Sequence, residues 1–309
     1  MLVVKKSQST KIFEFQPLVS VIMNCHNGEY FLREAIDSVI GQSYQNWEII
    51  FWDNQSIDGS AEIFKSYSDN RMRYYYASSH TLLYEARNHA IDRSQGEFIA
   101  FLDVDDKWDS RKLERQIPLF NNPRVGVVYS NYFILSDKLS RIAHNYILPE
   151  GMVTNVLLGN YCVGLVTIIV RKGAFNKSGK PLCNPQYHII GDFDFIIRLS
   201  VEWEFLCIQQ PLAFYRYHGN NESSIKIKLH ILELQNWIIK NKKNYTIDKY
   251  SNFNKLIQIV WYLEGVNMIN ERNYALVFLH LLSSAPFLMK IKLLGMIILP
   301  KGILVYFKP

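Results

Sequence analysis

The sequence predicts an α/β fold with a largely parallel central sheet flanked by helices, followed by a C-terminal helical appendage. From residue 18 onward, short apolar runs alternate with amphipathic stretches, the pattern of a parallel sheet covered on both faces. Beyond residue 224 the pattern is almost wholly helical. An apolar fraction of 49% and an aromatic fraction of 14% in 309 residues are sufficient for a sizeable core.

The N-terminal third predicts strands and helices in strict alternation. Residues 18–23 form a short apolar run typical of a buried strand, and 30–40 carry apolar side chains at helical spacing. A polar break at 42–46 precedes a second strand at 47–52. An Asp-Gly-Ser turn then leads into a helix that ends at residue 67. A third strand, a helix and a fourth strand are expected at 73–76, 83–93 and 97–102.

The alternation loosens after Trp108. We expect a helix over 110–120 with Asp109 as its N-cap residue, and strands over 125–135 and 163–170. A further helix is expected over 192–201. The C-terminal region then reads as helix, apart from a polar stretch at 240–254.

Three carboxylates follow the fourth expected strand in an Asp-x-Asp-Asp sequence. They are Asp103, Asp105 and Asp106. Carboxylates that lose water need a partner and repel one another, so a divalent cation is the expected neutralising group. Mg²⁺ and Mn²⁺ take one or two protein carboxylates and complete their shell with substrate phosphates. The cluster therefore predicts a metal-assisted enzyme acting on a phosphorylated substrate; solvated turn residues are the alternative.

Asp53 ends the second expected strand. Ligands of parallel sheets bind beyond the carboxyl ends of the strands, where both Asp53 and the acidic cluster fall. A carboxylate at this position can accept hydrogen bonds from a nucleobase or a ribose hydroxyl. The alternative is a turn-forming residue in Asp-Asn-Gln-Ser.

Cysteine usage and the N-terminal sequence indicate a cytoplasmic protein. The four cysteines lie far apart and match neither a disulfide framework nor a zinc site. Lysines interrupt residues 1–15, so no signal-peptide core is expected there. Glycine-rich phosphate loops and the common hydrolase motifs are missing from the sequence. Metal and basic side chains are therefore expected to hold the phosphates.

The C-terminal region is both basic and apolar. Residues 225–309 contain 12 Lys/Arg and 4 Asp/Glu, a balance of +8 against +6 for the whole chain. Its apolar segments are broken by His, Pro and Lys, and fall short of the roughly 20 residues that a spanning helix needs. Apolar helices edged with lysine suit a membrane interface, so we expect packing before Ser284 and a membrane-surface role for 284–309. Nucleic-acid binding is not expected, because interleaved arginines and regularly spaced aromatics are missing.

A series of short segments between about residues 18 and 224 carries a family resemblance. The segments are 19–27 (Val-Ser-Val-Ile-Met-Asn-Cys-His-Asn), 38–44 (Ser-Val-Ile-Gly-Gln-Ser-Tyr), 48–60 (Glu-Ile-Ile-Phe-Trp-Asp-Asn-Gln-Ser-Ile-Asp-Gly-Ser), 86–88 (Ala-Arg-Asn), 96–98 (Gly-Glu-Phe), 102–106 (Leu-Asp-Val-Asp-Asp), 191–199 (Gly-Asp-Phe-Asp-Phe-Ile-Ile-Arg-Leu) and 215–221 (Tyr-Arg-Tyr-His-Gly-Asn-Asn). Each is weak alone, but in this order and spacing the set resembles family 2 glycosyltransferases.

The resemblance implies a GT-A fold and inverting transfer of a sugar from a nucleotide diphosphate sugar donor. It implies that Asp192 is the general base on the acceptor hydroxyl. It also implies that Asp103 and Asp105 bind Mg²⁺ or Mn²⁺. The donor-binding candidates are Asn24, Asn27, Asp53, Arg87, Asp103 and His218.

Several of these residues have a second interpretation. Asp192 can be the N-cap of the following helix, and Asp194 can take the base role if the loop geometry differs. Arg198 is expected to pair with one of these two carboxylates. Arg87 is equally well explained as a surface arginine on a helix. The chain also departs from the family pattern: Asn24 replaces Pro, Asn-Gln replaces Asp-Gly at 54–55, and Gly replaces Glu at 191, which leaves the preferred donor open.

These observations predict an N-terminal extension (1–16), a GT-A domain (17–224) and a basic helical region (225–309). Within the domain, 17–125 is expected to bind the nucleotide sugar and 126–224 the acceptor. The predicted function is metal-dependent, inverting sugar transfer to a lipid-linked saccharide in cell-surface polysaccharide synthesis, at the inner face of the plasma membrane. Two alternatives are a catalytically silent nucleotide- or sugar-binding partner of a polysaccharide synthase, and a nucleotidyltransferase, whose glycine-rich phosphate loop the sequence lacks.

Overall fold

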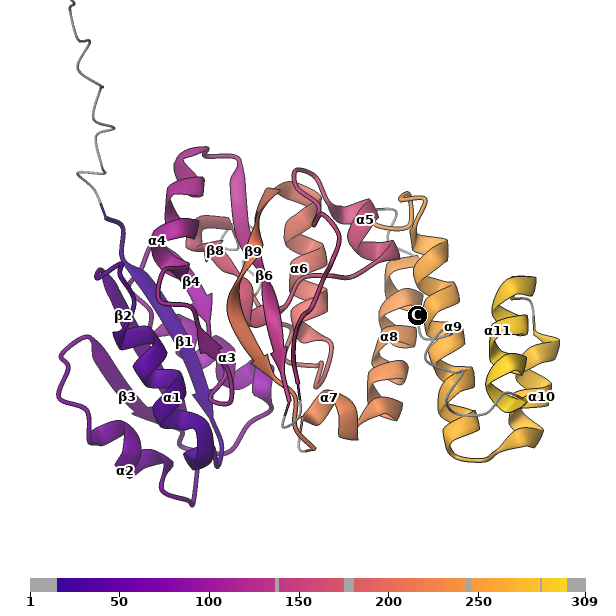
Figure 1. Cartoon of the computed structure of the whole chain (residues 1–309), viewed down its shortest axis with the longest axis horizontal. Coiled ribbons are helices and arrows are strands. Elements are labelled where there is room, and N and C mark those ends of the chain that lie inside the picture. Colours follow the sequence, from indigo (N-terminus) through magenta and orange to yellow (C-terminus); the bar gives the residue numbers. More distant parts are fainter. Residues whose placement is uncertain are drawn as a thin grey trace, which may run out of the picture.

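A single twisted sheet runs through the protein. The computed structural model describes residues 16–136, 139–174, 181–219, 221–242, 246–283 and 285–298. Within these ranges the sheet has 9 strands in the order β3-β2-β1-β4-β8-β6-β9-β5, with β7 paired to β6 (Figure 1). The strands are β1 (Val19–Cys25), β2 (Trp47–Asp53), β3 (Met72–Tyr76), β4 (Phe98–Phe101), β5 (Lys107–Trp108), β6 (Val125–Leu135), β7 (Ser140–Ile142), β8 (Ile169–Arg171) and β9 (Glu204–Arg216).

The first four strands are parallel and lie where the sequence predicts them. In their register Cys25 lies opposite Asp53, and Ile22 lies opposite Phe101. The carboxyl ends of β1, β2 and β4 therefore meet at one edge of the sheet. Beyond β4 the sheet is mixed, because β8 pairs antiparallel with both β4 and β6, whereas β6 and β9 are parallel.

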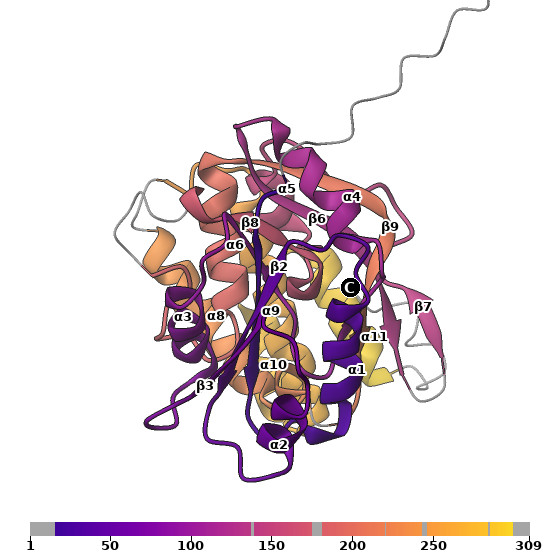
Figure 2. The same cartoon turned by 90° about the vertical axis from the view of Figure 1, so that its left-hand side faces the viewer.

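Helices cover both faces of the sheet, as Figures 1 and 2 show. They are α1 (Glu29–Ile40), α2 (Ser60–Lys65), α3 (Leu83–Asp92), α4 (Lys112–Gln116), α5 (Thr154–Gly159), α6 (Gly191–Glu202), α7 (Glu222–Ile225), α8 (Ile227–Lys242), α9 (Phe253–Asn270), α10 (Tyr274–Leu282) and α11 (Phe287–Ile298). Side chains of α1, α2 and α4 form one core cluster, and those of α3, α5, α6, α8 and α9 form the other. The predicted sheet with helices on both faces is confirmed.

Three local predictions are wrong. The segment expected to be a strand over 163–170 contains a 3-10 turn (Leu165–Thr167), and the strand is limited to Ile169–Arg171. The helix expected over 110–120 is α4 followed by a 3-10 turn, since Pro118 cannot continue an α-helix. Asp109 is not the N-cap of α4; its carboxylate accepts a hydrogen bond from the backbone N–H of Arg111, the residue in the cap position.

The core continues past residue 225. On α8, Trp237 is fully buried in the same cluster as the α6 side chains, and Phe253 and Val260 of α9 also belong to it. Helices α10 and α11 contact α9 and form a small separate cluster with it around Val277 and Leu293. No helix among the described residues is both long and apolar enough to cross a membrane.

Candidate active site

One large cavity opens at the carboxyl ends of β1, β2 and β4. Its volume of about 1000 Å³ is at the upper end of the range for small-molecule sites. Part of the wall comes from the loop before α6 and from the segment after β9. Most of the predicted site residues line it, namely Asn24, Asn27, Arg87, Asp103, Asp105, Asp192 and His218.

Asp53 is not among the residues that line this cavity. It is fully buried, and its carboxylate accepts hydrogen bonds from the Tyr74 hydroxyl (2.6 Å) and the backbone N–H of Ser56 (2.7 Å). The next residue, Asn54, lines the cavity instead. Its side-chain amide donates to the backbone carbonyl of Thr81 (2.8 Å) and accepts from the backbone N–H of Thr81 (3.2 Å). Successive side chains of a strand point to opposite faces, but apolar side chains occupy both faces of β2, so the sequence carries no signal that separates Asn54 from Asp53.

The acidic loop after β4 brings two predicted metal ligands together. Asp103 accepts a hydrogen bond from the Arg87 guanidinium (2.6 Å), and Asp105 lies 3.0 Å from Nε2 of His218. Burial and the charge of Asp103 raise the pKa of Asp105, and the hydrogen bond with His218 counteracts them in part. The loop therefore holds more negative charge than its own side chains neutralise.

The end of β9 fixes the conformation of this loop. The backbone N–H of Arg216 donates to the Asp106 carboxylate (2.8 Å). The guanidinium of Arg216 donates to the backbone carbonyl of Asp105 (2.9 Å). Asp106 is buried, and burial with the two neighbouring carboxylates raises its pKa well above the usual range. Asp106 is therefore an anchor for the loop, which leaves Asp103 and Asp105 as the ligand candidates.

Asp103 and Asp105 suit a hard divalent cation. In the part of the chain that the structure describes, no group of three or more His, Cys, Asp or Glu side chains could hold a metal ion. Two neighbouring carboxylates fit Mg²⁺ or Mn²⁺, which bind through one or two carboxylates and take further oxygens from phosphate and water. A cation between them would also offset the repulsion that raises the pKa of Asp105.

Arg87 and Asn24 carry polar atoms suited to a ligand. Arg87 lies on α3 and is 2% exposed, so the interpretation as a surface arginine is wrong. Burial favours a lower pKa for Arg87, but the charge and hydrogen bond of Asp103 act in the opposite direction together with Tyr84 and Cys183, and the pKa is raised. Nε of Arg87 is buried without a hydrogen-bond partner among the described residues. The same is true of both side-chain polar atoms of Asn24. Buried polar groups in this state fit a site that a polar ligand completes.

Asp192 faces the cavity from the start of α6. Its carboxylate accepts hydrogen bonds from the backbone N–H of Phe193 (2.8 Å) and the Tyr84 hydroxyl (3.1 Å). Burial raises the pKa of Asp192, while the charge of Arg87 and these two hydrogen bonds act in the opposite direction. Asp192 is not the N-cap of α6, since Ile190 occupies that position.

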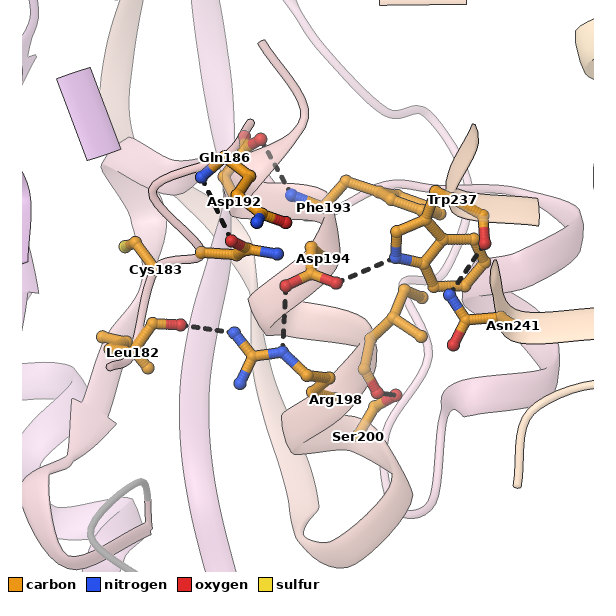
Figure 3. A network of polar contacts seen from close by, with 12 residues as sticks. Leu182, Cys183, Gln186, Asp192, Phe193, Asp194, Arg198, Ser200, Trp237 and Asn241 are labelled. Atoms are coloured by element: carbon orange, nitrogen blue, oxygen red, sulfur yellow. Dashed lines mark hydrogen bonds and ion pairs between the residues drawn. The ribbon is translucent and has the colours of Figure 1, made fainter. Parts of the chain in front are cut away.

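Asp194 lies on the other side of α6, away from the cavity. It is 7% exposed and bonds to Nε of Arg198 and to Nε1 of Trp237, both at 2.9 Å (Figure 3). The predicted pairing of Arg198 with a neighbouring carboxylate is confirmed. A carboxylate held by two donors in the core is poorly placed to take a proton from a substrate.

Tyr84 is a site residue that the sequence reasoning missed. Its hydroxyl donates to the Ile189 carbonyl (2.8 Å) and reaches Asp192, so it joins α3 to the loop before α6. Tyr84 and Arg87 are three residues apart on α3 and therefore share a helix face. That spacing was the available signal.

Comparison with known proteins gives a consistent result. The profile described as Glycosyl transferase family 2 matches residues 20–198. The "Putative teichuronic acid biosynthesis glycosyltransferase TuaG" of Bacillus subtilis is 31% identical over 216 residues, 69% of this chain and 84% of that protein. The Escherichia coli protein WfaP, "UDP-Glc:alpha-D-GlcNAc-diphosphoundecaprenol beta-1,3-glucosyltransferase", is 34% identical over 216 residues, 68% of this chain and 82% of its own.

A solved structure also resembles this one. It is the mannosyltransferase PcManGT from Pyrobaculum calidifontis in complex with GDP-Man and Mn²⁺. The TM-score is 0.65 at 13% sequence identity, covering 95% of this chain and 84% of the other. Identity this low shows a shared fold and nothing more. The GT-A fold is thereby confirmed.

Proposed function

The chain belongs to glycosyl transferase family 2, and we propose that it moves a sugar from a nucleotide diphosphate sugar to a hydroxyl of a lipid-linked saccharide. One observation carries this proposal: a single cavity places the Asp103–Asp105 pair and Asp192 on its walls. The names of TuaG and WfaP support an acceptor of cell-surface polysaccharide synthesis, carried on a lipid diphosphate. Glycosyltransferase activity is the coarser statement that the family itself establishes.

Residues 17–125 are proposed to bind the donor. Asn24 and Asn27 lie at the end of β1 and beyond it, and Asn54 follows β2, so these amides surround the proposed nucleoside end of the cavity. Arg87 supplies a buried positive charge next to Asp103, suited to a diphosphate. Asp53 is proposed to stabilise the loop after β2, because its carboxylate accepts a hydrogen bond from the backbone N–H of Ser56, and not to contact the nucleobase.

Asp103 and Asp105 are proposed to hold Mg²⁺ or Mn²⁺, with His218 beside Asp105. The bound cation would offset the negative charge that develops on the departing nucleoside diphosphate. Arg87 keeps the Asp103 carboxylate oriented through their 2.6 Å ion pair, which also supplies the buried guanidinium with the partner it needs. The pair of Arg87 and Asp103 is therefore proposed to keep the loop ready for the donor.

Asp192 is proposed to be the general base, in the acceptor half formed by residues 126–224. A sugar hydroxyl is a poor nucleophile while it keeps its proton, and a carboxylate on the cavity wall can accept it. The raised pKa of Asp192 increases its basicity towards that proton. Because Asp194 is held in the core by Arg198 and Trp237, it cannot act as a nucleophile beside Asp192, which supports inversion at the sugar.

Binding of a nucleoside diphosphate is the first test. At about 100 times its dissociation constant, one of UDP, GDP, dTDP, CDP or ADP is expected to stabilise the protein by about 2.7 kcal/mol in the presence of Mn²⁺. Thermal unfolding measures this, with EDTA and the matching nucleoside monophosphate as controls. Folded protein that responds to none of the diphosphates would contradict the donor site and favour a protein without nucleotide-dependent activity.

We further propose that α10 and α11 lie on the cytoplasmic face of an anionic membrane. Large apolar side chains are exposed on both helices, among them Phe278, Leu282, Phe287 and Leu288. No Asp or Glu occurs after Glu271 in the sequence, whereas lysines and an arginine do. This combination suits a negatively charged headgroup region. Of the predicted membrane segment 284–309, residue 284 and residues 299–309 lie outside the described residues.

Co-sedimentation with vesicles tests this surface. The protein is expected to bind vesicles that contain anionic lipid more tightly than neutral ones, and to lose about tenfold in affinity on Phe287→Ser with Leu288→Ser, which remove exposed apolar area. The matched control is Ile57→Ser, because Ile57 is 92% exposed and lies in the connection between β2 and α2, two elements that Figure 1 shows far from α10 and α11. Equal vesicle binding by all three proteins would contradict the proposal.

A further inference from the structure

A buried glutamate on α8 holds the loop that leads to Asp192. Glu233 is 7% exposed, and its carboxylate accepts hydrogen bonds from three successive backbone N–H groups. The distances are 2.6 Å from His188, 2.9 Å from Ile189 and 3.1 Å from Ile190. Ile190 is the N-cap residue of α6, and Asp192 follows two residues later. The carboxylate therefore lies where the N-terminus of a helix favours an anion.

A second contact joins the same face of α8 to the other side of α6. Trp237 lies one helical turn after Glu233, is fully buried, and donates from Nε1 to Asp194 at 2.9 Å (Figure 3). Asp194 in turn holds Arg198, whose guanidinium donates to the Leu182 carbonyl. His230 lies almost one turn before Glu233. Burial lowers the pKa of His230, and the nearby charge of Asp192 acts in the opposite direction.

We propose that Glu233 is a positioning residue for the reaction, which fixes the backbone at 188–190 and thereby the place of the Asp192 carboxylate in the cavity. This inference rests on the proposed role of Asp192 as the base. It extends the catalytic unit into α8, because Glu233 lies outside the residues 20–198 that the family profile matches. A carboxylate suits the task because it has only acceptor oxygens, enough for three N–H donors.

Glu233→Gln tests the proposal. Glutamine keeps the size of the side chain but replaces one acceptor oxygen by an NH₂ group, which cannot accept from the loop. We expect kcat to fall about 10- to 100-fold, since small misplacements of catalytic groups have effects of this size. The KM for the donor and the Kd of the nucleoside diphosphate should stay unchanged, because the donor side of the cavity is untouched. The measured rate is the rate at which UDP-glucose or GDP-mannose is cleaved. It is divided by the concentration of nucleotide-binding sites, which calorimetric titration gives.

A second background separates positioning from a general structural role. In Asp192→Asn protein, adding Glu233→Gln should cause no further loss, because a positioning residue acts only through the group that it positions. Equal losses in both backgrounds would overturn the proposal. The matched control is Glu271→Gln, which removes the charge of Glu271 at the end of α9, weakens its ion pair with Lys228 of α8 (2.9 Å) and leaves the loop alone. Wild-type protein without sugar-nucleotide cleavage would contradict the proposed function, whereas active wild type with an unimpaired Glu233→Gln variant contradicts only this inference.

Two further measurements do not depend on turnover. Hydrogen exchange at the amides of 188–190 should be faster in Glu233→Gln than in wild type and in Glu271→Gln, since three hydrogen bonds are weakened. Unchanged exchange there would also overturn the proposal. Should Glu233→Gln fail to fold, Trp237→Phe keeps an aromatic ring in the core, removes the donor to Asp194, and is expected to lower kcat by a smaller factor.

Discussion

Asp192→Asn is expected to lower kcat for sugar transfer by about 10³-fold, within the range that general bases contribute. Asparagine fills the same space, and its amide oxygen can still accept from the Phe193 N–H and the Tyr84 hydroxyl. It cannot accept a proton from the acceptor hydroxyl. The substitution therefore removes the proposed base and leaves the cavity intact, and steady-state kinetics with donor and acceptor measures the loss.

Stability should move in the opposite direction. Burial raises the pKa of Asp192, so its ionised form is disfavoured in the folded protein, and neutral asparagine avoids that cost. The melting temperature of Asp192→Asn is expected to equal or exceed that of wild type, and nucleoside diphosphate binding should be unchanged. Asp92→Asn, at an exposed position near the end of α3, is the matched control for both measurements. A large drop in melting temperature would instead indicate a structural role for Asp192.

The pH dependence of kcat provides a second check on the same residue. A base must be unprotonated to act, so activity should fall as the pH drops through the raised pKa of Asp192. The acid limb is therefore expected at a higher pH than the ordinary aspartate pKa of 3.8 would give. The Asp192→Asn variant should lack this limb. An acid limb that persists unchanged in the variant would assign it to another group.

The parallel part of the sheet was predictable because its strands are apolar on both faces. Every residue of β1 and β2 is buried, and short runs made up mostly of apolar residues on both faces have few other interpretations. β9 was missed because it is partly exposed and contains Gln209, Gln210 and Pro211 in its middle. Yet β9 is the strand whose end at Arg216 fixes the acidic loop. Arg216, which orients the acidic loop, thus lies in a part of the sequence whose hydrophobic pattern did not predict a strand.

The candidate site shows the same division. Asp103, Asp105 and Asp192 were identifiable because carboxylates in family-like segments are conspicuous in a sequence. Whether Asp53 or Asn54 reaches the cavity depends on which face of β2 each side chain takes, and both faces of that strand are apolar. The bonds from Glu233 join residues more than 40 positions apart through backbone N–H groups, which any residue type supplies. A glutamate on a helix is ordinarily exposed, so nothing in its sequence context marks this one as buried.

Asp105→Asn is expected to separate metal-dependent activity from stability. Several kcal/mol of charge stabilisation by a cation corresponds to a loss of about 10²- to 10³-fold in kcat when its ligand is removed. Stabilisation by nucleoside diphosphate should also lose its dependence on Mn²⁺. In the absence of metal, however, the melting temperature should rise, because burial and the charge of Asp103 disfavour the Asp105 carboxylate in the folded protein.

A fall in kcat together with a rise in the metal-free melting temperature distinguishes a metal ligand from a structural carboxylate. A structural carboxylate that is replaced would lower the melting temperature with or without metal, because the hydrogen bond with His218 (3.0 Å) would be lost without compensation. Asp106→Asn, at the next residue of the same loop, is the matched control: it keeps an acceptor for the Arg216 N–H and should retain the dependence on Mn²⁺. Wild-type nucleotide binding that is insensitive to EDTA would remove the metal from the proposal. Asp103 and Asp105 would then act on the donor through Arg87 and His218, the two cationic or protonatable partners that they already hold.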